Sequence, residues 1–176
     1  MAEPTEIDVW QGDIAELEVD AVVVAASESL FMTSGAASGV KRRAGDEVER
    51  AAVEQGPIAP GMAVATYGGD LSAPYVIHAV AVGHDRVADP QTLEAAVRAA
   101  LGFAEPLQLR RVAIALLGIE HGAFAPSEAA ALLVPAVIEA TRSTPVESVV
   151  LAASHASEVK ALSDALRAAR AGATVS

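Results

Sequence analysis

The pattern of apolar positions alternates between two kinds of segment. Short apolar runs, several of them rich in valine, predict strands, and the valine run at 22–24, which lacks polar alternation, predicts a strand buried on both faces. Between the runs, apolar residues recur at a spacing of three and four, which predicts amphipathic helices. The predicted strands are 7–10, 21–26, 62–66, 75–80, 111–117 and 147–152, and the predicted helices are 39–44, 47–55, 89–104, one that follows 127, and 157–169.

Local signals set the expected helix boundaries. Asp89 is placed as an N-cap, with Pro90 at the first helical position. Ser127 is expected to cap the next helix, in which Pro135 predicts a kink or a break. Strands that alternate with helices predict a layered α/β fold. We expect one domain over 1–176, frayed at about 1–5 and 172–176.

One stretch, residues 20–45, combines a buried strand, a loop of small residues and a helix start. Backbone N–H groups in such an arrangement can surround an anion. A second small-residue loop, 118–124, also follows a predicted strand, and ligands bind at the carboxyl ends of strands in open α/β sheets. The two loops together could clamp a diphosphate. The alternative is that their glycines only form the tight turns of an α/β domain.

Composition narrows the function classes. Of the 176 residues, 52% are apolar and 3% aromatic, so we expect a core of small and aliphatic side chains. The net charge of −11 argues against binding to nucleic acid or anionic lipid. Without cysteine there is no disulfide and no thiolate nucleophile or metal ligand. The acidic N-terminus is unlike a signal peptide and no apolar run could span a membrane, so we expect a cytoplasmic protein.

Few side chains form a recognisable reactive group. Asp13 could accept a hydrogen bond from an adenine amino group, or cap its own turn. No pair of histidines has the i, i+4 spacing of a zinc site, so no metal is expected, and His78 is interpreted as a core residue. No serine has an evident partner base. The basic cluster at 41–43 is interpreted as a solvated helix face.

Several ordered motifs resemble those of the macro domain family. The segments GDI and VDAVVVAAS resemble the family's GDI and VDAIVNAAN, and 118–124 resembles its second phosphate loop, GTGxGGF. Residues 35–45, 56–66 and 75–80 are similar to the segments between them. The resemblance implies a three-layer α/β/α sandwich with a mixed, roughly six-stranded sheet. It also implies binding of ADP-ribose or a related nucleotide, and in some members hydrolysis of ADP-ribosyl or O-acetyl-ADP-ribose esters.

The resemblance also implies a set of ligand-binding residues. Asp13 corresponds to the aspartate that recognises adenine, Gly35 and Ala36 to backbone donors to the diphosphate, and Phe124 to a residue beside the distal ribose. The full set is Asp13, Ile14, Ser27, Ser34, Gly35, Ala36, Gly118, Ile119, Glu120, His121, Gly122, Ala123 and Phe124.

Four departures from the family motifs weaken this expectation. The two asparagines of the motif NAAN are Val24 and Ser27, and Thr33 and Ser34 replace the leading glycines of the first loop. The aspartate of hydrolytic members falls on 37 or 38, which are alanine and serine. A central glycine of the second loop is Glu120. Its carboxylate would repel a diphosphate at ~4 Å by about 1 kcal/mol in bulk water and by more when shielded, and a residue other than glycine would be strained at a left-handed position.

Three hypotheses stay open. The first is a module that binds ADP-ribose or an adenine nucleotide weakly and without turnover. The second is an ester hydrolase, and the third is a degenerate domain with a closed pocket that serves in oligomerisation or protein interaction. None of them requires a cofactor, and the oligomeric state is not predicted.

Overall fold

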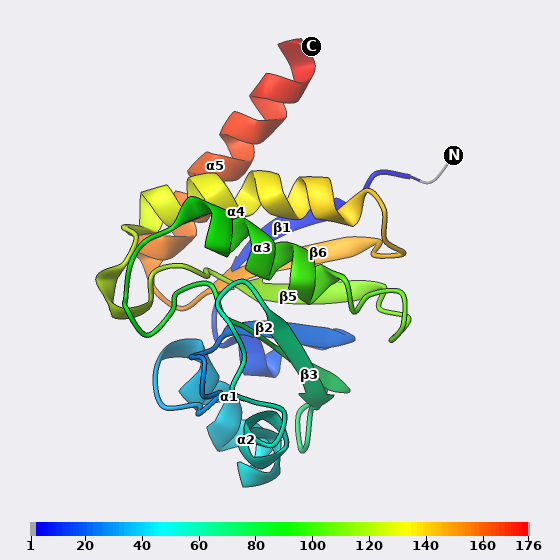
Figure 1. Ribbon diagram of the computed structural model, residues 1–176. Helices are drawn as coiled ribbons and strands as arrows, with labels where there is room; N and C mark the ends of the chain where they lie inside the picture. The colour runs from blue at the N-terminus through cyan, green and yellow to red at the C-terminus, as the bar shows by residue number, and fades with distance from the viewer. Residues whose placement is uncertain (1–2, 176) are drawn as a thin grey trace.

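A computed structural model describes residues 3–175 and contains one mixed six-stranded sheet (Figure 1). The strand order is β1-β6-β5-β2-β4-β3, and β3 alone runs antiparallel to its neighbour in this sheet. The strands are β1 (Glu6–Gln11), β2 (Ala21–Ala25), β3 (Ala63–Tyr67), β4 (Tyr75–Ala79), β5 (Arg111–Ala115) and β6 (Ser148–Ala153).

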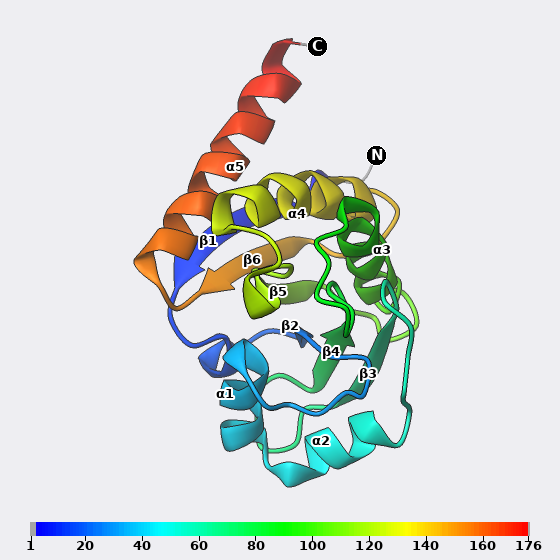
Figure 2. The same ribbon diagram turned by 60° about the vertical axis from the view of Figure 1, so that its left-hand side comes forward.

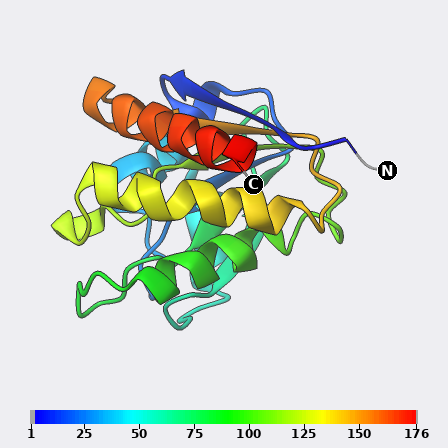
Figure 3. The same cartoon turned by 90° about the horizontal axis from the view of Figure 1, so that it is seen from above.

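Helices cover both faces of the sheet. Helices α3, α4 and α5 lie side by side on one face, whereas α1 and α2 lie on the other (Figures 1, 2 and 3). Their bounds are α1 (Gly35–Ala44), α2 (Asp46–Val53), α3 (Pro90–Leu101), α4 (Pro126–Thr141) and α5 (Ala156–Val175). Two short 3-10 turns, Ile14–Glu16 and Glu120–Gly122, lie in the loops after β1 and β5. This confirms the expected three-layer α/β/α sandwich.

Strand β2 shows why the sequence needs two helical layers. Ala21 and Val23 pack into the core shared with α3, α4 and α5, while Val22 and Val24 pack into the core shared with α1. All four side chains are fully buried. A strand with this uninterrupted valine run is stable only when both of its faces are covered.

Besides shifts of one to three residues at the ends of α2 and α3, the helices differ from expectation in four places. Helix α1 begins at Gly35 rather than at 39, because the small residues at 36–38 continue the helix instead of forming loop. Ser127 lies inside the first turn of α4, where Glu128 Oε1 instead accepts the N–H of Ala125. Helix α4 also continues through Pro135, since burial of its neighbours outweighs one missing hydrogen bond.

The fourth difference is at the C-terminus. Helix α5 was expected to end at 169 but extends to Val175 and projects beyond the sheet (Figure 2), whereas the fraying expected at 172–176 stays a prediction. Residues 1–2 and 176 lie outside the described part of the chain. At the other end, Thr5 is held by a hydrogen bond from its Oγ1 to the carbonyl of Val146 (2.9 Å). The expected cap at Asp89 is confirmed, because its Oδ1 accepts the N–H of Gln91 (3.0 Å).

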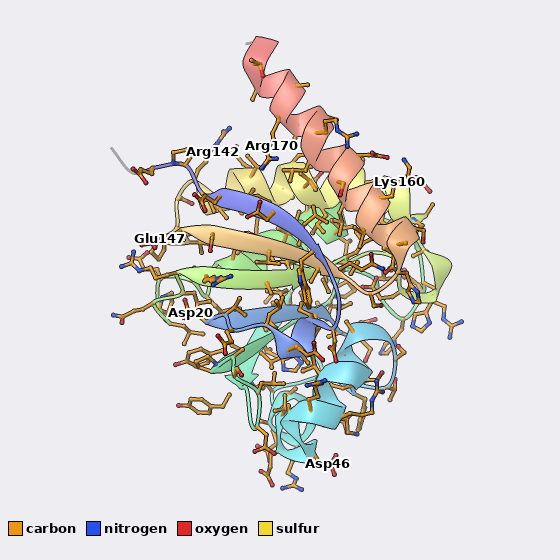
Figure 4. The ribbon with its side chains drawn as sticks, turned by 180° about the vertical axis from the view of Figure 1, so that it is seen from behind. Asp20, Asp46, Arg142, Glu147, Lys160 and Arg170 are labelled. Atoms are coloured by element: carbon orange, nitrogen blue, oxygen red, sulfur yellow. The ribbon has the colours of Figure 1, made fainter. Side chains whose placement is uncertain are left out.

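Two polar contacts fix the strands away from the site. The Asp20 carboxylate accepts the N–H groups of Arg110 and Arg111 (2.7 and 2.8 Å), which ties the amino ends of β2 and β5 together. Arg170 donates to the carbonyl of Ile7 (2.8 Å), which holds α5 on the edge strand β1 (Figure 4).

His78 on β4 is a core residue, as interpreted from the sequence, but only one of its two ring nitrogens has a hydrogen-bond partner among the described residues. It is fully buried, and Nε2 lies 3.0 Å from Oγ1 of Thr66 on β3. The other ring nitrogen, Nδ1, has no hydrogen-bond partner within residues 3–175. Burial lowers the pKa of His78 to about 4, because the charged imidazolium is poorly solvated there.

This pKa predicts a loss of stability in acid. The folded state binds the proton less well than the unfolded chain does, so the contribution of His78 is complete above about pH 6.5 and falls by about 1.4 kcal/mol per pH unit toward pH 4. Urea unfolding at about pH 7 and about pH 4.5 should show a smaller loss for His78→Gln than for the wild type. An imidazole NMR titration of the wild type provides the check. A His78 resonance that titrates near pH 6.5 would contradict the assignment.

Candidate functional site

A cavity of about 1060 Å³ opens at the carboxyl ends of the parallel strands. Its floor includes the last residues of β2, β5 and β6, and its walls are the loops that follow β1, β2, β4, β5 and β6. Because five strands run parallel, these loops all emerge at one edge of the sheet. This is the place where ligands bind in open α/β sheets. The two loops singled out from the sequence therefore do face a common space.

Asp13 lies in the loop after β1 and lines the cavity there. Its Oδ1 accepts the N–H of Ala15 (2.9 Å), so the turn-capping interpretation is confirmed. Its Oδ2 lies 3.1 Å from Nε of Arg43 on α1, and Arg43 also pairs with Glu16 (2.6 Å). The Asp13 side chain is still 41% exposed, and each carboxylate oxygen has a second lone pair. The cap therefore leaves Asp13 able to accept one further hydrogen bond from a ligand.

The first loop (residues 26–34) leads directly into the N-terminus of α1. Ser34 is the N-cap residue but makes no side-chain capping bond, and Gly35 has a left-handed φ of 59°. Ser34, Gly35 and Ala36 all line the cavity. The first N–H groups of a helix have no partner within the helix, and the first turn of α1 carries no acidic residue. This end of α1 can accept an anion.

Side chains outside the cavity hold the first loop in position. Glu49 on α2 accepts the N–H of Met32 (2.7 Å) and pairs with Lys41 on α1 (2.8 Å). The hydrogen bond from Lys41 lowers the pKa of the Glu49 carboxyl, so this anchor is ionised. Glu28 accepts the N–H of His84 (2.6 Å), which joins the first loop to the loop after β4.

The second loop (residues 118–124) is a tight turn with three left-handed residues. They are Gly118 (φ 101°), His121 (φ 55°) and Gly122 (φ 71°). The left-handed non-glycine residue is therefore His121 rather than Glu120, and the strain expected at Glu120 is wrong. The turn is closed by backbone hydrogen bonds from Gly122 to Ile119 and from Phe124 to Gly118 (3.1 and 3.0 Å).

The Glu120 side chain folds back onto its own loop. Its Oε2 accepts the N–H of Gly118 (2.8 Å). Its Oε1 is buried and has no hydrogen-bond partner in the described part of the chain. Burial raises the pKa of the Glu120 carboxyl, and the hydrogen bonds that it accepts from backbone N–H groups only partly oppose this.

Nine of the thirteen residues expected from the resemblance line the cavity. They are Asp13, Ile14, Ser27, Ser34, Gly35, Ala36, Ile119, Glu120 and His121. The structure places Gly118, Gly122, Ala123 and Phe124 outside the lining. Phe124 is buried in the core, and its ring lies close to Gly118. Ser27 shares a hydrogen bond with Ser29 (3.1 Å) and faces the cavity from the first loop.

Other lining residues were not expected from the sequence. They are chiefly Phe31, Arg42, His84, Arg86, Ser154, His155 and Glu158. Phe31 is 51% exposed although aromatic residues are rare in this chain. Ser154, His155 and Glu158 follow β6, and their position after a parallel strand was the signal that could have revealed them. Three of the four histidines of the chain lie here.

The described residues contain no group of three or more histidine, aspartate or glutamate side chains that could hold a metal ion. Among the described helices, none is long and apolar enough to cross a membrane.

Comparison with known proteins identifies the family. The macro domain model matches residues 23–133. A protein of Mycobacterium tuberculosis is 37% identical over 132 residues, which are 75% of this chain but 37% of that protein, so the chain spans little more than a third of that relative's length. An O-acetyl-ADP-ribose deacetylase of Klebsiella pneumoniae is 35% identical over 150 residues, 81% of this chain and 85% of that protein. This chain belongs to the macro domain family.

Solved structures show the same fold. The Oceanobacillus iheyensis macrodomain with ADP has a TM-score of 0.86 at 20% identity and covers 93% of this chain and 91% of its own. The Trypanosoma brucei macrodomain in complex with ADP-ribose has a TM-score of 0.83 at 21% identity, with 90% and 68% covered. Those two macrodomains bind ADP and ADP-ribose.

The two glycines in the loop after β5, Gly118 and Gly122, should differ in how well they tolerate substitution by alanine. A Cβ on Gly118 would lie 2.5 Å from Leu93 and 3.2 Å from Phe124, both packed in the core, whereas a Cβ on Gly122 would meet nothing within 4 Å. Gly122→Ala should lower the free energy of unfolding by about 1–2 kcal/mol through left-handed strain. Gly118→Ala should lose about 1–3 kcal/mol more through overpacking. Urea unfolding measures both, and equal losses would contradict the packing described at Gly118.

Proposed function

We propose that this macro domain binds ADP-ribose or a related adenine nucleotide, weakly and without turnover. The observation that carries the proposal is the open cavity, in which Asp13 and the N-terminus of α1 line one continuous space with the second loop. A volume of about 1060 Å³ suits a ligand of nucleotide size. An open cavity also favours binding over the alternative of a degenerate domain with a closed pocket.

Hydrogen bonding supports a base at one end and phosphate at the other. The spare lone pairs of Asp13 suit an adenine amino group. The unpaired N–H groups at the start of α1 suit a phosphate, and Arg42 from the same helix also lines the cavity. These positive features stand out on a chain whose net charge is −11.

Two substitutions relative to the family motif support low affinity. Ser27 offers one hydroxyl where the motif has an asparagine amide, so the distal ribose loses a two-point contact. Glu120 takes the N–H of Gly118 and adds a negative charge to the cavity wall.

The absence of turnover is inferred from the start of α1. The aspartate of hydrolytic members falls on 37 or 38, which are a buried alanine and a serine, and neither carries a carboxylate. Among the described residues, the carboxylates that line the cavity are Asp13, Glu120 and Glu158. Asp13 is paired with Arg43, Glu120 Oε2 accepts the N–H of Gly118, and Glu158 lies in the first turn of α5 rather than on α1. We infer that none of them takes the place of the missing aspartate in activating water.

Ester hydrolysis is the second candidate, because one relative is named an O-acetyl-ADP-ribose deacetylase. Its test is direct: the wild-type protein is incubated with O-acetyl-ADP-ribose and the release of acetate is followed by NMR. We expect no release above the buffer rate, because positions 37 and 38 are alanine and serine and supply no carboxylate. Sustained turnover that depends on protein concentration would replace the binding module with the hydrolase.

Calorimetric titration with AMP, ADP and ADP-ribose tests the binding proposal. We expect measurable but weak binding by the wild type. Asp13→Asn keeps an oxygen for the N–H of Ala15 but removes the charge that faces the base, so it should weaken all three nucleotides alike, by about tenfold.

Glu16→Gln is the matched control, because Glu16 is the other partner of Arg43 and does not line the cavity. It should leave nucleotide affinity unchanged. A wild type that binds none of the nucleotides would remove the proposed function. Nucleotide binding that is unaltered in Asp13→Asn would remove the role given to Asp13.

A further inference from the structure

The second loop already holds an anion, which belongs to the protein itself. Its three left-handed residues, Gly118, His121 and Gly122, curve the backbone into a concave turn of the kind in which N–H groups bind anions. The Glu120 carboxylate occupies this turn, with Oε2 2.8 Å from the nitrogen of Gly118.

The remaining N–H groups at the end of the loop are also in use. Gly122 donates to Ile119 and Ala123 to Glu120 (both 3.1 Å), while Phe124 donates to Gly118 (3.0 Å). These bonds hold the turn closed. A ligand phosphate could gain the N–H of Gly118 only by displacing the carboxylate.

A phosphate beside this carboxylate is disfavoured because of where the carboxylate lies. Oε1 of Glu120 is buried without a partner in the described residues, so its charge is poorly screened. Ile119 on one side and His121 on the other line the cavity together with Glu120, which places this charge at the wall. A second phosphate arriving there would meet a negative group in a poorly solvated position.

The first anion position does not share this obstacle. The start of α1 has no acidic residue in its first turn, and Ser34 makes no side-chain bond that would use its N–H groups. A nucleotide with its base at Asp13 can therefore place one phosphate at α1.

We infer that Glu120 is a specificity-determining residue that occupies the second loop as an internal anion, so that the domain prefers adenine nucleotides with one phosphate to those with two. This rests on the proposed function, because it assigns the ligand class of the same cavity. The discrimination arises from the occupied N–H of Gly118 and the charge beside it.

The test compares AMP and ADP in four proteins: the wild type, Glu120→Ala, Glu120→Gln and Glu158→Gln. Glu120→Ala vacates the turn, and Glu120→Gln keeps an oxygen for Gly118 but removes the charge. Glu158→Gln is the matched control, because Glu158 also lines the cavity but makes no bond to the second loop.

The wild type should bind AMP at least as tightly as ADP. Glu120→Ala should tighten ADP by about tenfold and AMP by less than about twofold. Glu120→Gln should give an intermediate ratio, and Glu158→Gln should change both nucleotides by the same factor. Circular dichroism and thermal unfolding check that each variant folds.

A second measurement does not depend on a nucleotide. The amide resonance of Gly118 is followed by NMR while inorganic phosphate is added. It should shift in Glu120→Ala and stay in place in the wild type.

Each result bears on a separate claim. If the ratio of ADP affinity to AMP affinity is the same in the wild type and in Glu120→Ala, the role of Glu120 is overturned. The same holds if Glu158→Gln raises this ratio as much as Glu120→Ala does. An unshifted Gly118 amide in Glu120→Ala overturns the anion-binding turn. Failure of every variant to bind either nucleotide overturns the proposed function, whatever phosphate does at Gly118.

Discussion

The structure depends on a single constraint, the burial of β2 on both faces. Ala21, Val23 and their alternating neighbours satisfy two separate cores, so helices must cover each side of the sheet. The strands that pair with β2 run parallel to it, and their loops emerge together at one edge. The cavity follows from this geometry, because its walls are the loops that leave the carboxyl ends of parallel strands and the starts of the helices that follow them.

Much of this architecture could be predicted from the sequence, since burial of valine runs and helical spacing are local signals. The placement of both loops at one cavity was also expected, because each loop follows a predicted strand and ligands bind at the carboxyl ends of strands. Helix boundaries were less predictable: small residues at 36–38 suit loop or helix equally, and only packing of α1 against the sheet decides between them. Pro135 gave a local signal for a break that tertiary burial overrode.

The candidate site was predictable in outline but not in its side-chain directions. The sequence indicated that Glu120 departs from the family motif, and it could not show that the carboxylate turns back to Gly118. That direction depends on backbone angles at three residues of the loop. His84 and Arg86 were missed because the loop after β4 carries no recognisable motif, although β4 is parallel to β2 and delivers that loop to the same edge.

Glu49 holds the first loop in position from outside the cavity. One carboxylate on α2 holds both the backbone of Met32 and the side chain of Lys41, and Glu49 itself does not line the cavity. The shape of the cavity thus depends partly on α2, a helix that does not line the cavity. A substitution of Glu49 would therefore move the first loop while leaving every residue that lines the cavity unchanged.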